Sequence, residues 1–170
     1  MTVSAAAITD RAVQYWGKRR GMYSNVMGFL GGVNFAILVA RVCLMYPRAC
    51  GATLVRKFFL VFSHWTWGIG NPIMICGRES GGCPALDALV WDSQTARGAE
   101  LFPILTPCYP TSNSTFNVSV RLARSCTVRM GSVSTAQALQ QWACASERRV
   151  PVVAKRQEAQ QARACPFAVW

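Results

Sequence analysis

The longest apolar run of the chain lies between residues 33 and 44, where only Asn34 and Arg41 interrupt it. Apolar residues at this density fall on every face of a helix, which is typical of a helix buried inside a bundle. Pro47 follows where a helix stop is expected, because proline cannot continue the hydrogen-bonded ladder. The pattern therefore predicts a buried helix over residues 33–44 that ends before this proline.

A helix is also predicted before this run, over residues 10–20, with its end at Gly21. Thr9 or Asp10 is the expected N-cap residue, because a side-chain oxygen there can accept a hydrogen bond from the first free backbone N–H groups. Helical spacing groups four side chains on one stripe: Ala12, Tyr15, Trp16 and Arg19.

A further helix is predicted after residue 53, with Thr53 as its N-cap. Apolar side chains recur there at helical spacing, at Leu54, Phe58, Val61, Phe62 and Trp65. This spacing places them on one face, which predicts that the helix packs against the run at 33–44.

The rest of the chain predicts little regular structure. Residues 68–110 are rich in glycine and proline and lack periodic apolar positions, which indicates an extended loop with short turns. Residues 120–170 are basic, and the short helices compatible with residues 134–144 and 153–163 have no clear buried face. The predicted fold is therefore mainly α, with an incomplete helical bundle, a long loop and a poorly structured C-terminal tail.

The tail admits two interpretations. Eight of its residues are Lys or Arg, against two Glu. A solvated segment without a partner and a basic arm that contacts RNA both fit this composition.

The stretch between Arg20 and Arg41 must be weighed as a membrane span. It holds twenty residues without a charge, which is long enough to cross a bilayer as a helix. Residues 21–32, however, contain four glycines together with Ser24 and Asn25, so the apolar part shrinks to roughly a dozen residues, which is short for a bilayer. We therefore expect no membrane partner, and we interpret the glycine-rich entry as a close approach to a ligand or a neighbouring backbone.

Composition adds a charge preference. Eighteen Lys and Arg residues against seven Asp and Glu give a net charge of +11, which favours partners rich in phosphate or anionic membrane surfaces. A basic surface without a specific partner is the alternative. The eight cysteines form no Cys-x-x-Cys pair, and the only histidine is His64. No zinc pattern is present, so we predict reduced, structural cysteines and no metal site.

Five segments carry a resemblance to a known family. In order, they are KRRGMYSNVMGFLGGVNFAILVAR at 18–41, TLVRKFFLVFSHWTW at 53–67, NP at 71–72, VWD at 90–92 and LFPILTPCYPTSNSTFNVS at 101–119. The chain resembles the central domain of eukaryotic poly(A) polymerases over residues 10–119, although residues 68–89 depart from the pattern. We therefore divide the chain into a central-domain segment, residues 10–119, and a divergent basic tail, residues 120–170.

The resemblance implies a function for the whole enzyme. Members of this family add adenylates to RNA 3′ ends in mRNA 3′-end polyadenylation. The resemblance therefore implies ATP as substrate, RNA 3′ ends and 3′-end processing factors as partners, and a nuclear location. It also implies Mg²⁺ or Mn²⁺ in the complete enzyme, held by aspartates of a catalytic palm domain.

The carboxylates of such a palm are not found in this sequence. No two of its seven acidic residues are separated by a single residue: Asp10, Glu79, Asp87, Asp92, Glu100, Glu147 and Glu158. We expect neither a catalytic residue nor a metal ligand in this chain, and we expect the chain alone to be inactive.

By resemblance, the ATP-facing residues of the central domain are Tyr23, Asn25, Gly32 and Val33. The two polar side chains would make polar contacts, and the Gly-Val pair would pack closely against the nucleotide. Gln14 stands where the family has a lysine that bonds the triphosphate. Glutamine can donate a hydrogen bond but cannot neutralise phosphate charge, so weaker ATP binding is expected.

Two points stay open at this level. Lys18 belongs to the family signature and either binds phosphate or lies at a solvated helix end. The chain itself is either the ATP-closing part of a poly(A) polymerase or a non-catalytic basic protein, derived from that domain, that binds RNA or a polyadenylation partner. An in-frame Gly-Ser and Asp-x-Asp palm encoded upstream of Met1 would favour the first; a promoter immediately upstream would favour the second.

Overall fold

The computed structural model describes residues 3–77, 84–94, 96, 100, 102–118 and 120–132. Its helices are α1 (Val3–Arg19), α2 (Gly32–Met45), α3 (Gly51–Ser63), α4 (Pro84–Asp87) and α5 (Val120–Gly131). Within these residues the only β pairings are isolated bridges, so the prediction of a mainly α fold is confirmed. The helices considered at 134–144 and 153–163 lie outside the described residues.

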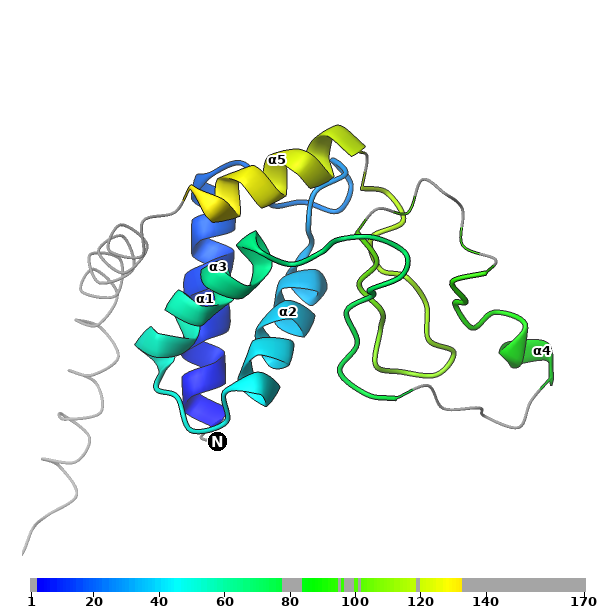
Figure 1. Cartoon of the computed structure of the whole chain (residues 1–170), viewed down its shortest axis with the longest axis horizontal. Helices are drawn as coiled ribbons and strands as arrows, with labels where there is room; N and C mark the ends of the chain where they lie inside the picture. The colour runs from blue at the N-terminus through cyan, green and yellow to red at the C-terminus, as the bar shows by residue number, and fades with distance from the viewer. Residues whose placement is uncertain are drawn as a thin grey trace, which may run out of the picture.

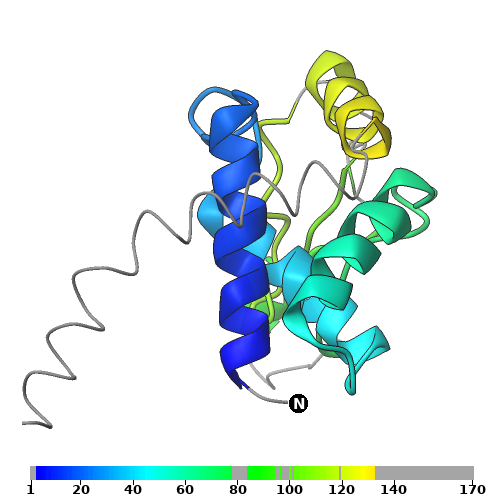
Figure 2. The ribbon, with the colours of Figure 1, turned by 90° about the vertical axis from the view of Figure 1, so that its left-hand side faces the viewer.

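The helices form one packed group. α1 contacts both α2 and α3, and α5 lies across the end of the group, where it contacts α3 (Figure 1). The side view in Figure 2 shows α1 on one flank, with α3 and α5 on the other. The segment between α3 and α5 extends to one side and carries the single-turn helix α4 at its far edge (Figure 1).

The helix predicted over residues 10–20 begins earlier than expected, at Val3. The prediction of Thr9 or Asp10 as the N-cap was wrong. The hydroxyl of the buried Thr9 donates to the carbonyl oxygen of Ala5 at 2.8 Å, so it bonds inside the helix. Alanine is the strongest helix former, and three consecutive alanines at residues 5–7 extend the helix toward its N-terminus.

The buried face of α1 is also rotated from the predicted stripe. Ala12 and Trp16 are buried as predicted, but Tyr15 is half-buried and Arg19 is exposed. The buried face is completed by Thr9, Val13 and Gly17. Neither Thr9 nor Gly17 is strongly apolar, which is why apolar spacing alone did not locate this face.

Gly17 marks a close approach of α1 to Phe35 of α2. A methyl group built at Gly17 would lie 2.9 Å from Cζ of Phe35, closer than van der Waals contact allows. The ring of Phe35 therefore occupies the space that any side chain at this position would need.

The other two core helices match their predicted positions. α2 covers the apolar run and buries seven of its residues. α3 buries Leu54, Phe58 and Phe62 as predicted, but Val61 and Trp65 are only half-buried, and Trp65 lies beyond the end of the helix. The N-cap is Cys50, not Thr53. Thr53 lies inside the helix with Oγ1 3.2 Å from Sγ of Cys50, because the helix begins two residues before it, at Gly51.

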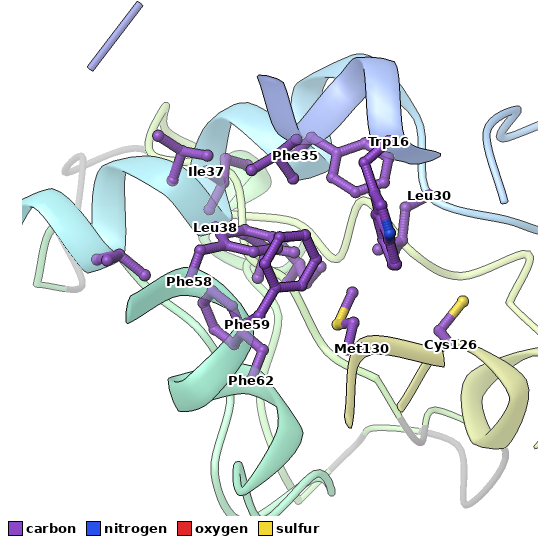
Figure 3. Close-up of a cluster of buried hydrophobic side chains, with 14 of the residues drawn as sticks. Trp16, Leu30, Phe35, Ile37, Leu38, Phe58, Phe59, Phe62, Cys126 and Met130 are labelled. Atoms are coloured by element: carbon purple, nitrogen blue, oxygen red, sulfur yellow. The ribbon is translucent and has the colours of Figure 1, made fainter. Parts of the chain in front are cut away.

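Aromatic rings fill the centre of the core (Figure 3). Trp16 of α1 meets Phe59 of α3 edge to face, with ring centroids 4.8 Å apart, and Phe58 packs against both Phe59 and Phe62. Such edge-to-face pairs add stability beyond the area that they bury. The core therefore joins α1, α2 and α3 into one unit.

α5 completes this core and was not predicted. Cys126 and Met130, one helical turn apart, are both buried and belong to the core cluster, on its α5 side in Figure 3. The guanidinium of Arg129 donates to the backbone oxygen of Arg20 at 2.5 Å, which ties α5 to the end of α1. Of residues 120–170, the described helix α5 thus packs on the helical bundle.

The long segment before α5 is the predicted extended loop, held by half-buried polar groups. Glu100 Oε2 accepts hydrogen bonds from the Trp91 indole at 2.7 Å and from Asn113 Nδ2 at 2.9 Å. Asn113 Oδ1 in turn accepts from the backbone N–H groups of Ile104 and Thr115. These contacts hold the described part of the loop together, where the only strand pairings are isolated bridges.

The same loop packs against α2. The Ser114 hydroxyl lies 2.5 Å from Oδ1 of the buried Asn34 and 2.8 Å from the carbonyl oxygen of Ile104. Arg41 donates to the backbone oxygen of Met74 at 3.4 Å.

In the part of the chain that the structure describes, no helix is both long enough and apolar enough to cross a bilayer.

Candidate functional site

The turn between α1 and α2 brings its residues back onto both helices. Gly21 follows the end of α1 with a φ of +65°, a conformation that costs glycine little. The backbone N–H groups of Met22 and Gly21 bond to the carbonyls of Gly17 and Lys18, which is a Schellman motif. The glycine therefore ends α1 and redirects the chain toward the start of α2.

Tyr23 is positioned by this turn. Its backbone pairs with that of Leu30 in an isolated bridge. Its ring is stacked on Phe35 of α2, with centroids 6.0 Å apart and an interplanar angle of 4°. The ammonium group of Lys18 lies over the same ring, 4.5 Å from the centroid, which is within the range of a cation–π contact.

Gly32 lies opposite the Tyr23 hydroxyl, at the first residue of α2. A Cβ atom built on Gly32 would lie 3.0 Å from Oη of Tyr23 and 3.9 Å from Oε1 of Gln14. Three of the expected site residues, from α1, the turn and α2, therefore meet at one point. Because Gly32 has no side chain, the Tyr23 hydroxyl and the Gln14 amide can both lie close to its backbone.

Gln14 has its own partner on α1. Its Nε2 donates to Oδ2 of Asp10 at 2.8 Å, one helical turn away. The other carboxylate oxygen of Asp10 is buried and has no hydrogen-bond partner among the residues that the structure describes. One of the two N–H donors of the Gln14 amide is therefore already engaged.

Asn25 and Val33 flank this point. A Cβ atom built on Gly31 would lie 3.3 Å from Cβ of Asn25, so the asparagine contacts the glycine before Gly32. Oδ1 of Asn25 is buried without a partner in the described part of the chain. Val33 is 64% exposed in the first turn of α2, so its apolar surface is open to a ligand.

Positive charge gathers at the C-terminal end of α1. Lys18, Arg19 and Arg20 are all exposed there. Cations at this end of a helix interact favourably with the helix dipole, and the same charges attract phosphate groups.

A metal site is not formed by the residues that the structure describes, since among them no group of three or more His, Cys, Asp or Glu side chains converges. His64 bonds locally, with Nδ1 3.0 Å from the Ser63 hydroxyl and 3.0 Å from the carbonyl oxygen of Leu60. It therefore interacts with its own helix end.

The five described cysteines are free thiols and differ in environment. Burial raises the pKa of Cys43, and it raises the pKa of Cys126 to about 11. Cys50 is exposed, and hydrogen bonds from the side chain and then the backbone of Thr53 lower its pKa. No disulfide links these five residues.

Sequence reasoning missed Asp10 as part of this site. It is four residues before Gln14 on the same helix, a spacing at which side chains meet. That signal was available, but Asp10 was interpreted as a capping residue. Sequence reasoning also missed Arg129, whose contact with Arg20 depends on the position of α5.

Comparison with known proteins identifies the protein family of this chain. Residues 6–149 match the model of the poly(A) polymerase central domain, so the match extends past residue 119 and includes α5. The chain is 50% identical over 113 residues to nuclear poly(A) polymerase 4 of Arabidopsis thaliana, a match over 65% of this chain. Nuclear poly(A) polymerases 2 and 1 of the same plant are 49% and 48% identical over the same length.

The matched region is a small part of these relatives. It covers 15% of nuclear poly(A) polymerase 4 and 14% of nuclear poly(A) polymerase 2. With most of its length matched to the family model, this chain belongs to the poly(A) polymerase central-domain family.

Proposed function

We propose that this chain supplies the ATP-closing central domain of a nuclear poly(A) polymerase that adenylates RNA 3′ ends during polyadenylation. The observation that supports the ATP site is the convergence of Gln14, Tyr23 and Gly32: a Cβ atom on Gly32 would lie 3.0 Å from Tyr23 Oη and 3.9 Å from Gln14 Oε1. Glycine at this position leaves room for the two polar groups, and such groups beside apolar surface can orient a ligand.

Each site residue then has a role that its surroundings allow. The Tyr23 hydroxyl offers a hydrogen bond, and its ring is held between α1 and α2 by Lys18 and Phe35. Asn25 offers a second polar contact. Val33, which is exposed, offers an apolar surface for the base.

The divalent metal that the family implies finds no ligand set among the described residues. We therefore assign no step through a metal to this chain. Its own residues bind and orient the nucleotide, and the carboxylates that hold the metal would belong to another domain of the enzyme. RNA 3′ ends and 3′-end processing factors are its proposed partners.

Replacing Gly32 with alanine tests the ATP site. The added methyl group would lie 3.0 Å from the Tyr23 hydroxyl, so it must displace that side chain or the ligand. Alanine also favours helix formation, so the fold should be retained. We expect ATP binding, measured by isothermal titration calorimetry, to weaken by about tenfold, which corresponds to about 1.4 kcal/mol.

Gly70→Ala is the matched control, because a methyl group at Gly70 meets no atom within 4 Å. Equal ATP affinity of the two variants would contradict the proposed site. If the unmodified chain binds no ATP but binds RNA, and Gly32→Ala leaves the RNA affinity unchanged, the non-catalytic RNA-binding alternative would be supported instead.

A further inference from the structure

The hydrogen bond between Asp10 and Gln14 fixes which end of the Gln14 amide faces the candidate site. A carboxylate only accepts hydrogen bonds, so the amide must turn its NH₂ group toward Asp10. Nε2 accordingly lies 2.8 Å from Oδ2 of Asp10. The carbonyl oxygen Oε1 is left to face Gly32, 3.9 Å from the position of its missing Cβ atom.

Asp10 holds this orientation firmly. Its second oxygen, Oδ1, is buried and has no hydrogen-bond partner in the described part of the chain. If the Gln14 amide turned over, the carboxylate would lose the hydrogen bond at Oδ2 as well. Leaving a buried acceptor unsatisfied costs about 1 to 3 kcal/mol, and more when the group is charged.

We propose that the Asp10–Gln14 pair makes the phosphate-facing position of this site a hydrogen-bond acceptor, so that the site recognises the nucleoside part of its ligand and not the triphosphate. This inference rests on the proposed nucleotide site. Phosphate oxygens are also acceptors and carry negative charge, so the Gln14 carbonyl oxygen and the nearby carboxylate both disfavour them. A ribose hydroxyl or a base amino group is a donor and fits the same position.

The positive charge near the site does not reverse this preference. Lys18 lies two turns further along α1 than Asp10 and is placed over the Tyr23 ring. Its charge is exposed, and exposed charges are screened by salt. The group closest to Gly32 on α1 remains the Gln14 carbonyl oxygen.

The test compares the affinities of the full chain for adenosine, AMP and ATP. Calorimetry is done without divalent cations and at constant ionic strength, because salt changes the phosphate contribution. We expect adenosine to bind as tightly as ATP or more tightly. ATP binding about tenfold tighter than adenosine would overturn the inference.

Variants separate the orientation of Gln14 from the charge of Asp10. Asp10→Ala removes both, whereas Asp10→Asn removes the charge but keeps an oxygen that can accept from Gln14. We expect the ratio of ATP to adenosine affinity to rise several-fold in Asp10→Ala and less in Asp10→Asn. Adding Gln14→Lys to Asp10→Ala should raise that ratio by about tenfold over the unmodified chain, because a lysine there is free to bond phosphate.

Asp87→Asn is the matched control. It removes the same charge at an exposed residue of α4 and keeps an acceptor for the Tyr109 hydroxyl, which donates to Oδ1 of Asp87 at 2.6 Å. An unchanged affinity ratio in Asp10→Ala, or an equal rise in Asp87→Asn, would overturn the inference.

The hydrogen bond itself has an independent readout. The side-chain NH₂ resonances of Gln14 in an NMR spectrum should shift in Asp10→Ala and stay in place in Asp87→Asn. Resonances that do not move in Asp10→Ala would overturn the inference even if nucleotide binding is weak. Failure of adenosine, AMP and ATP alike to bind, with the NMR shift present, would instead refute the proposed nucleotide site.

Discussion

Cys50 and Cys126 show how the same thiol group acquires different chemistry from its neighbours. Cys50 is exposed at the start of α3, where the Thr53 hydroxyl lowers its pKa, whereas burial against α3 raises the pKa of Cys126 to about 11. Only the thiolate is nucleophilic, so at a given pH the group with the lower pKa has the larger reactive fraction. We expect iodoacetamide to modify Cys50 well before Cys126.

Thr53→Val tests the cause of this difference. Without the hydroxyl, the pKa of Cys50 should rise, so the pH at which alkylation reaches half its maximal rate should move upward. Mass spectrometry of the Cys50 peptide after timed labelling measures this rate, and Thr66→Val, at another exposed threonine, is the control. A profile that stays in place in Thr53→Val would show that the hydroxyl does not set the pKa.

At the scale of the element, α5 contributes buried side chains to the core that the sequence did not predict. Met130 is fully buried against the bundle, whereas Val128 on the same helix is 70% exposed. Met130→Ala should therefore lower the free energy of unfolding by about 2 to 5 kcal/mol, through lost apolar contact and the cavity that remains. Urea unfolding followed by circular dichroism measures the change.

Val128→Ala is the matched substitution on the exposed face and should change the free energy of unfolding by less than about 0.5 kcal/mol. Similar effects of the two substitutions would mean that α5 does not pack on α3 in solution. A large effect of Met130→Ala alone would show that the folded unit continues beyond residue 119. The resemblance in sequence had placed the end of the central-domain segment at that residue.

The elements differ in how far the sequence could predict them. α2 and α3 were predictable because many strongly apolar side chains recur at helical spacing, and their burial confirms the pattern. α5 buries Cys126 and Met130 among polar neighbours, so its periodic signal is weak although its contacts are fixed. Its packing depends on a surface of α3 that no local pattern describes.

The candidate site was predictable to a similar, limited extent. Resemblance named Tyr23, Gly32 and Gln14, and the structure brings these three together. The direction in which the Gln14 amide points depends on its hydrogen bond to Asp10, which is a property of the folded helix. Spacing shows that the two side chains can meet, but it does not show whether the oxygen or the nitrogen of the Gln14 amide faces the site.

At the scale of the whole molecule, we expect the purified chain not to incorporate AMP into an RNA primer with ATP and either Mg²⁺ or Mn²⁺. Metal-assisted phosphoryl transfer needs converging carboxylates, and none of the described acidic side chains converge in this way. The measurement is primer extension on a denaturing gel, with a complete poly(A) polymerase as the positive control. Extension that persists through repeated purification would show that this chain holds its own catalytic residues.

Gly17 lies outside the candidate site and yet supports its geometry. The Phe35 ring can pack against α1 because residue 17 has no side chain. The same ring is stacked on Tyr23, whose hydroxyl faces Gly32. A single methyl group at residue 17 would have to displace the Phe35 ring or separate the two helices, and either shift would disturb Tyr23, although no residue in contact with a ligand would have changed.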